Sequence, residues 1–404
     1  MWCEKNKRKF FNLSLNYKII KNPIKIYFIV LELSLAMIII RKIKTKDYKE
    51  YSHINYNKTN NKTNNKTNNE TNNQNNSKKI LGKKIGVISL VHQKNLGNCL
   101  LKFAMYTILK ELGFDPCIVG QRMGHNDITF IQNNLNIRIV NTFNEINKND
   151  YDILMVSSDQ TWRPWSSEFY NIAFLEFAKD WDIPKFVYGA SIGLDYWFFE
   201  NKTNEIAKNL LKDFTGISTR EISTLKYIKQ YLGLDATYVL DPTMLIDKKY
   251  YLQIIDNYQN KNIIKSNYIL KYKVERMNNM ESFIKKAINE LGYEMIEVNL
   301  FEKDYIEKFL YVLNNCKAVI TNSYHATIFS IIFNKPFVCF HNKKIGSSRF
   351  DTIRDIYGIK DRFFDENETP DLNLLNTPLI MNNTSIDYYR DISLNYLKKN
   401  LNIL

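Results

Sequence analysis

The sequence predicts an α/β protein with two domains, each built on a parallel sheet, behind a basic N-terminal extension. Short apolar runs alternate with helical segments from residue 84 onward, a pattern typical of parallel, doubly wound sheets. Asp241-Pro242-Thr243 interrupts this alternation, which then begins again. The extension differs from the rest of the chain in charge and composition. These observations indicate two Rossmann-like domains that face each other across a cleft.

Length and cysteine usage limit the class of protein. With 404 residues, 45% of them hydrophobic, the chain is long enough for two domains with sizeable cores. Its five cysteines are scattered without paired spacing, which argues against a zinc ribbon or a disulfide framework and favours a reducing compartment. No cluster of His and Asp suggests a metal site, and no cofactor is expected.

The net charge of +14 belongs to the extension. Residues 1–84 hold 19 Lys and Arg against 5 Asp and Glu, and the remainder holds 37 residues of each sign. The body therefore lacks the overall basic surface that nucleic-acid binding requires, and no nucleic-acid partner is expected.

Residues 1–56 form a basic extension with an apolar stretch from Ile24 to Ile40. This stretch is short for a membrane span, Glu32 lies in its middle, and no small-residue cleavage site follows it. We expect a helix on the anionic inner face of a membrane, with basic residues on both flanks and the body in the cytoplasm. The alternatives are a single span, or a start at Met37 with residues 1–36 untranslated.

Residues 57–79 repeat a Lys-Thr-Asn-Asn unit without apolar side chains, which predicts a disordered tether. We place the first domain at 80–240, the second at 241–385 and a C-terminal helix at 386–404. Strands are expected at 85–91, 117–119, 152–156, 186–188 and 217–218, and then at 268–274, 294–298, 318–321 and 337–340. Ligands of such sheets bind beyond the carboxyl ends of the strands.

The segment Ser323-Tyr324-His325 lies between an apolar strand and an apolar helix. Free backbone N–H groups at a helix N-terminus attract anions, and Ser323 can cap the helix or bind a phosphate. His325 is one of only five histidines, and we expect it to be catalytic. The alternative is that Ser323 is only a cap and His325 only fills space.

Asp159 follows the strand at 152–156 and is a candidate general base for a sugar hydroxyl, with an ordinary helix cap as the alternative. Gln160 and Trp162 come next and are candidates for substrate binding. The indole of Trp162 would either stack on a sugar ring or belong to the core.

Arg220 follows the strand at 217–218 and is suited to a bidentate grip on phosphate or carboxylate. A surface pair with Glu221 is the alternative.

Gly97 and Asn98 lie in a turn before the first helix, near a helix end that favours anions. Arg349 is a candidate for a further anion contact.

Taken together, seven segments in this order resemble those of the polysaccharide pyruvyl transferase family. They are Asn95-x-Gly97-Asn98-x-Leu100 with Phe103-Ala104, Ser158-Asp159-Gln160-x-Trp162, Ala190-Ser191-x-Gly193, Arg220-Glu221, Leu240-Asp241-Pro242-Thr243, Ser323-x-His325 with Phe329-Ser330, and Arg349-Phe350.

The resemblance implies a fold like that of GT-B glycosyltransferases. It also implies transfer of a pyruvyl group from phosphoenolpyruvate to two hydroxyls of a sugar, in a cell-surface polysaccharide or its lipid-linked precursor, forming a cyclic ketal. By similarity, His325, Arg220 and an acidic residue, for which we choose Asp159, form the active site. We expect His325 to act as the acid and Asp159 as the base.

This chain departs from the family at Ala326, where the family often has glycine, which would reduce the room beside the histidine. Two other functions fit the same pattern. One is a glycosyltransferase that uses a nucleotide sugar in the same cleft. The other is an inactive, membrane-tethered relative that binds sugar.

Overall fold

The structure is a computed structural model that describes residues 82–90, 94–119, 124–140, 142–164, 168–261, 267–342 and 346–403. The predicted extension at 1–56 and the predicted tether at 57–79 lie outside the described residues. Within those residues, no helix is both long enough and apolar enough to cross a membrane.

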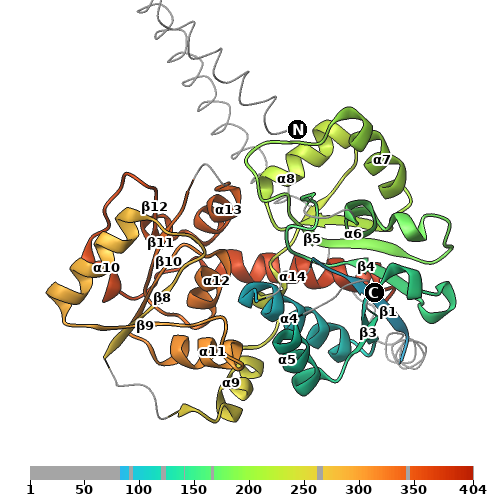
Figure 1. The fold of residues 1–404 in the computed structure, drawn as a ribbon. Helices are drawn as coiled ribbons and strands as arrows, with labels where there is room; N and C mark the ends of the chain where they lie inside the picture. Colours follow the sequence, from blue (N-terminus) through green and yellow to red (C-terminus); the bar gives the residue numbers. More distant parts are fainter. Residues whose placement is uncertain are drawn as a thin grey trace, which may run out of the picture. The chain divides into compact units, whose positions relative to one another are not determined.

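The first sheet has seven parallel strands in the order β3-β2-β1-β4-β5-β6-β7 (Figure 1). The order reverses between β1 and β4, the switch point at which doubly wound sheets bind ligands. The strands are β1 (Lys84–Ile88), β2 (Asp115–Val119), β3 (Arg138–Val140), β4 (Ile153–Val156), β5 (Lys185–Ala190), β6 (Gly216–Thr219) and β7 (Thr237–Tyr238).

Helices cover both faces of this sheet because successive side chains of a strand point to opposite faces. Ile85 and Val87 pack in one apolar cluster with α4 and α5, whereas Ile88 packs in another with α6 and α7. The helices are α4 (Leu96–Glu111), α5 (His125–Leu135), α6 (Phe169–Phe174), α7 (Asn201–Leu211) and α8 (Ile222–Tyr227).

The second sheet has five parallel strands in the order β12-β11-β10-β8-β9. They are β8 (Tyr268–Tyr272), β9 (Glu294–Glu297), β10 (Ala318–Thr321), β11 (Phe337–Phe340) and β12 (Phe363–Phe364). The helices around them are α9 (Lys248–Asn257), α10 (Asn278–Leu291), α11 (Tyr305–Asn315), α12 (Tyr324–Ile332) and α13 (Ser348–Tyr357). Every residue of β10 and β11 is buried, as expected for parallel strands covered on both faces.

The predicted fold class is confirmed by these two parallel sheets. Strands β3, β7 and β12 are absent from the prediction because two or three residues are too few to show a periodic pattern. The apolar cluster that packs on α4 continues into the second domain through residues such as Leu270 and Phe329. One core therefore joins the two sheets.

The C-terminal helix α14 (Asn383–Asn400) returns to the first sheet. The Tyr396 hydroxyl donates to the carbonyl of Val187 at 2.7 Å, and the backbone N–H of Leu240 donates to Ser393 Oγ at 2.8 Å. The last helix of the chain thus holds strands of the first domain together.

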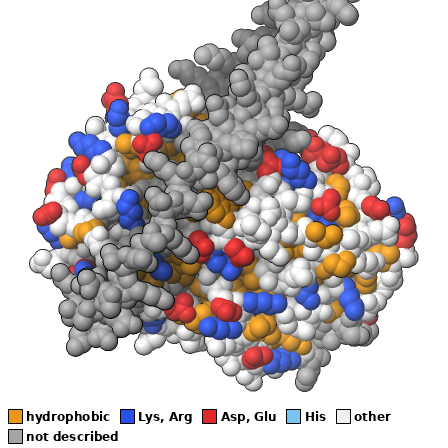
Figure 2. Space-filling view, turned by 180° about the vertical axis from the view of Figure 1, so that it is seen from behind, with side chains coloured by type: hydrophobic (Ala, Val, Ile, Leu, Met, Phe, Trp, Pro, Cys, Tyr) orange, Lys and Arg blue, Asp and Glu red, His pale blue; other side chains and the backbone are white. Residues whose placement is uncertain are grey.

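Acidic and basic side chains are interspersed over the described surface visible in Figure 2. This distribution agrees with the equal numbers of acidic and basic residues that the sequence has after residue 84.

Replacement of Leu397 by alanine should destabilise the protein by about 2–5 kcal/mol, because this fully buried side chain joins α14 to the core and its loss leaves a cavity. Chemical denaturation measures this change. Tyr388→Ala, on the exposed side of the same helix, should cost about 0.5 kcal/mol or less. Equal effects of the two changes would contradict the role given to α14.

Candidate active site

A pocket of about 520 Å³ lies beyond the carboxyl ends of strands from both sheets. The first domain lines it with Lys94, Asn95, Gly97, Asp159, Gln160 and Arg163. The second domain lines it with Tyr272, Lys273, Val274, Glu275, Leu300, Asn322, Ser323, Tyr324, His325, Asn342, Arg349 and Phe350. Most of the candidate residues that the sequence indicates thus meet at one cavity.

Asp159 lines the pocket three residues after β4, with a backbone φ of 104° that non-glycine residues rarely adopt. The Asp159 carbonyl accepts hydrogen bonds from the N–H groups of Ser191 and Thr161, at 3.0 and 2.7 Å. These bonds hold the unusual turn, which directs the carboxylate away from the strand and toward Arg220. Such backbone strain is typical of functional sites.

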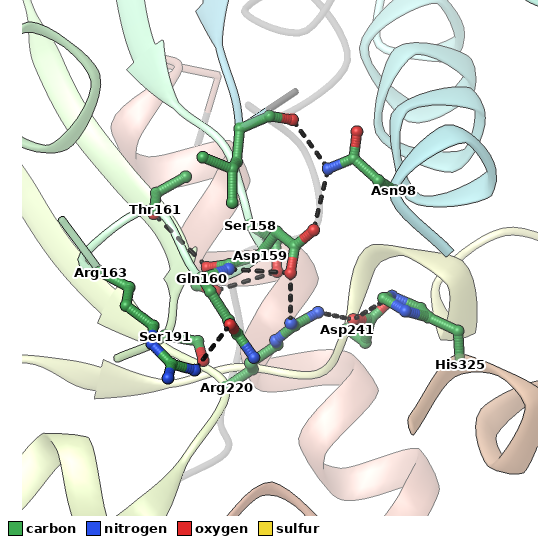
Figure 3. A network of polar contacts seen from close by, with 12 residues as sticks. Asn98, Ser158, Asp159, Gln160, Thr161, Arg163, Ser191, Arg220, Asp241 and His325 are labelled. Carbon is green, nitrogen blue, oxygen red and sulfur yellow. Dashed lines mark hydrogen bonds and ion pairs between the residues drawn. The ribbon is translucent and has the colours of Figure 1, made fainter. Parts of the chain in front are cut away.

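The Arg220 guanidinium is buried between two carboxylates (Figure 3). Its Nη2 donates to Asp159 Oδ1 at 2.9 Å and its Nη1 to Asp241 Oδ2 at 2.5 Å. The guanidinium also lies 4.7 Å from the centre of the Tyr324 ring. Arg220 is not among the residues that line the pocket, so the direct grip on phosphate expected from the sequence is not the contact that this arrangement offers. Nor is Arg220 the surface partner of Glu221.

Asp241 is the residue that our interpretation of the sequence missed. It follows β7 by three residues and begins the Asp-Pro-Thr turn, where its Oδ1 accepts from the N–H and the hydroxyl of Thr243 at 3.1 and 2.7 Å. Its Oδ2 lies 3.7 Å from His325 Nε2. The motif is visible in the sequence as a break between the domains and as one of the seven segments that resemble the family, but neither observation indicates a role for its carboxylate.

Both carboxylates are held in the ionised form. Burial alone would raise the pKa of Asp159, but Arg220, His325 and a hydrogen bond from Asn98 together hold it well below its usual range. Burial likewise opposes ionisation of Asp241, and His325, Arg220 and Thr243 hold its pKa below its usual range. Asp159 is therefore a weak base in this environment.

Asn98 and Lys102 support Asp159 from α4, where a spacing of four residues puts them on one face of the helix. The Asn98 amide donates to Asp159 Oδ2 at 2.8 Å and to the carbonyl of Leu90 at 2.7 Å. The ammonium of Lys102 contacts Asn98 Oδ1 and donates to the same carbonyl at 2.7 Å. Burial lowers the pKa of Lys102 to about 8. Asn98 thus positions Asp159, and it does not line the pocket.

His325 is the second residue of α12, and its imidazole packs on Gly97 of the first domain. A Cβ atom at Gly97 would lie 2.0 Å from His325 Nδ1, so only glycine fits there. Ser323 caps α12 by accepting from the N–H of Ala326 at 3.4 Å and also lines the pocket. Ala326 is fully buried and lies outside the pocket lining, so the departure from glycine at this position does not narrow the cavity.

Of the remaining candidate residues, two line the pocket and one lies in the core. Gln160 and Arg349 line the pocket, and the buried Nε of Arg349 has no hydrogen-bond partner among the described residues. Trp162 is fully buried and packs edge-on against Phe174 with ring centres 5.7 Å apart. Substrate stacking on Trp162 is therefore the wrong alternative, because its indole belongs to the core. No group of His, Cys, Asp and Glu within the described residues has the geometry of a metal site.

A family model for polysaccharide pyruvyl transferases matches residues 95–344. A search of curated proteins found no match. Among solved structures, the chain is similar to a UDP co-structure of MnaA from S. aureus, with 14% identity, a TM-score of 0.48 and coverage of 80% of this chain and 98% of the other. It is also similar to a UDP-GlcNAc 2-epimerase from Methanocaldococcus jannaschii, with 13% identity, a TM-score of 0.47 and coverage of 78% and 99%.

Replacement of Asp241 by asparagine should destabilise the protein by about 3–5 kcal/mol at pH 7, because Arg220 loses a buried ionic partner. A carboxylate whose folded-state pKa lies below its usual value stabilises the fold above that usual value, and this contribution disappears as the pH falls through the folded-state pKa. The stability difference between wild type and variant should therefore shrink below about pH 4. Denaturation at pH 7 and at the lowest pH at which the wild type stays folded measures it.

The control for this experiment is Asp235→Asn, which removes a carboxylate from an exposed pair with Lys229. It should change stability little at either pH. A loss in Asp241→Asn that does not depend on pH would contradict the ionic role of Asp241.

Replacement of Gly97 by alanine should lower turnover about 100-fold, because the new methyl group displaces the His325 ring. Alanine by itself favours a helix by about 1 kcal/mol, so the melting temperature should fall much less than the activity. In a His325→Ala background the same change should cost no further activity. An additive loss in the double variant would contradict this contact as the cause.

Proposed function

Because the chain belongs to the polysaccharide pyruvyl transferase family, we propose that it transfers a pyruvyl group from phosphoenolpyruvate to two hydroxyls of one sugar, forming a cyclic ketal. The single observation that best supports this proposal is the placement of His325. Its imidazole lies between a pocket with cationic side chains and the buried carboxylate of Asp241, 3.7 Å from Nε2.

The pocket suits a small, highly charged anion. Phosphoenolpyruvate carries a phosphate and a carboxylate, and both need cations or N–H donors. Arg349 and Lys94 line the pocket from opposite domains. The N-terminus of α12 adds backbone N–H groups and the positive end of a helix dipole. In this proposal Arg349, rather than Arg220, contacts the donor directly, since Arg220 is occupied by two carboxylates.

In this proposal His325 transfers protons in the first chemical step. The first chemical step adds a proton to the methylene carbon of phosphoenolpyruvate, which makes C2 electrophilic, and a sugar hydroxyl then adds to C2. The His325 imidazolium supplies the first proton, and the neutral ring accepts the proton of the attacking hydroxyl. Oδ2 of Asp241 faces Nε2 of this ring at 3.7 Å.

The second step closes the ketal. The bond between C2 and the phosphate oxygen breaks, and a second hydroxyl of the same sugar attacks C2. Its proton leaves with the inorganic phosphate, so that one hydroxyl proton ends on the new methyl group and the other on phosphate. Arg349 would stabilise the charge that develops on the departing phosphate.

Asp159 takes a different role in this proposal from the base expected from the sequence. Its low pKa makes it a poor acceptor of a proton from a sugar hydroxyl. It holds Arg220 in place, and Arg220 in turn holds Asp241 next to His325.

For the acceptor, we infer a sugar that is lipid-linked or polymeric, in a cell-surface polysaccharide or its precursor. Residues 1–56 would keep the enzyme at the anionic inner face of the membrane through their basic residues, with the catalytic body in the cytoplasm.

His325→Ala should lower the rate of phosphate release from phosphoenolpyruvate about 1000-fold in the presence of an acceptor, because proton transfer by a positioned side chain is lost. A phosphate-release assay with lipid-linked oligosaccharides measures it, together with the mass gain of a pyruvyl group on the acceptor. The exposed His125 gives the matched control, and His125→Ala should retain full activity. Full activity of His325→Ala would contradict the mechanism. Stabilisation of the wild type by a UDP-sugar but not by phosphoenolpyruvate would contradict the donor.

A further inference from the structure

The N-terminus of α13 is held by a carboxylate from the other domain. Asp195, in the loop after β5, accepts hydrogen bonds from the backbone N–H groups of Ser347 and Ser348. The distances are 2.9 and 3.0 Å from Ser347 N to the two carboxylate oxygens and 2.7 Å from Ser348 N to Oδ1. The Ser347 hydroxyl adds a fourth bond at 3.1 Å. A side chain of the first domain thus caps a helix of the second.

Asp195 replaces a cap that α13 does not supply itself. Ser347 occupies the cap position, but its side chain accepts no hydrogen bond from the first turn of the helix. The free N–H groups at a helix N-terminus need an acceptor, and a carboxylate also interacts favourably with the helix dipole. The cap of α13 therefore depends on the position of the first domain.

Two further contacts keep the domains in place at this point. A Cβ atom at Gly346 would lie 2.3 Å from the carbonyl oxygen of Gly193, so the two backbones touch where both residues are glycine. On the other side, the N–H of Ile222 at the start of α8 donates to Thr352 Oγ1 on α13 at 3.3 Å. The first domain thus contacts α13 both at its beginning and in its first turns.

Arg349 is the second residue of α13 and reaches the pocket. Its Nε is buried without a hydrogen-bond partner among the described residues, and its guanidinium lies 5.8 Å from the centre of the Tyr324 ring. The unpartnered N–H points to a ligand at this position, because buried donors are normally satisfied. The place of this guanidinium depends on where α13 begins.

We propose that Asp195 is a positioning residue for the anionic donor: by capping α13 from the opposite domain, it sets Arg349 at the pocket. This inference rests on the proposed function for the identity of the donor. Asp195 itself touches no substrate, and it acts through the backbone of residues 347–348 and then through Arg349.

Asp195→Ala should raise the dissociation constant for phosphoenolpyruvate about five- to tenfold, the effect expected when a helix cap that orders a binding residue is lost. The KM for phosphoenolpyruvate should rise by the same factor, while the KM for the sugar acceptor stays unchanged. A merely structural role would lower the melting temperature and leave the KM of the folded enzyme as it is. Isothermal titration and steady-state kinetics on the full chain measure these quantities.

Asp351→Ala is the matched control, because Asp351 is also a carboxylate in the first turn of α13 but belongs to the same domain. It should change the affinity for phosphoenolpyruvate less than twofold. Asp195→Asn keeps an acceptor oxygen and should restore part of the lost affinity. In an Arg349→Ala background, Asp195→Ala should have no further effect on donor affinity.

Titration with inorganic phosphate beside phosphoenolpyruvate separates the two proposals. Failure of the wild type to bind phosphoenolpyruvate, with phosphate still bound, would contradict the proposed donor, and a weaker phosphate affinity in Asp195→Ala would still support the positioning role. Unchanged affinity of Asp195→Ala for whichever anion the wild type binds would overturn that role. Absence of binding to both anions would overturn both proposals.

Discussion

The ion pairs that Arg220 makes with Asp159 and Asp241 are the constraint on which the rest of the site depends. A guanidinium this deeply buried is tolerable only with ionic partners, since removal of a charge from water costs several kcal/mol. The pairs connect the segments that follow β4, β6 and β7 at one edge of the sheet. With Asn98 bound to Asp159, they also connect this edge to α4. The site is thus held by charge, and not only by the packing of its strands.

This arrangement also determines the electrostatics at His325. Arg220 is shared by two carboxylates, and Oδ2 of one of them, Asp241, lies 3.7 Å from the imidazole. His325 is in turn one of the groups that hold the pKa values of Asp159 and Asp241 below their usual range. The second carboxylate is therefore the part of the cluster that connects Arg220 to His325.

The sequence predicted the features that depend on local periodicity, which are the buried strands and the polar residues that follow them. Asp159, Arg220 and His325 were found because each follows a buried strand, and strands of a parallel sheet end at one edge. Asp241 was missed because β7 has only two residues and the proline after Asp241 looked like a boundary. For Trp162 the sequence left substrate stacking and the core as alternatives, because a tryptophan in a polar loop looks the same in sequence whether its ring faces a cavity or the core. Residue spacing carries no information about that direction.

The contacts between the domains could not be predicted from the sequence either, and the reason is more general. His325 packs on Gly97, and Asp195 caps α13, across separations of 228 and more than 150 residues. No pattern within a helix or strand reports which residues of the other domain lie opposite. A glycine in a helix usually costs stability, so Gly97 would be disfavoured if α4 alone decided its identity. The contact between Gly97 and the imidazole shows that the second domain determines the identity of this residue.

The catalytic histidine and the donor arginine that we propose both lie on the second domain, and both are positioned by residues of the first. The shared apolar core between the sheets is then a condition of the proposed chemistry, because a shift of one domain would move His325 and Arg349 together away from Gly97 and Asp195.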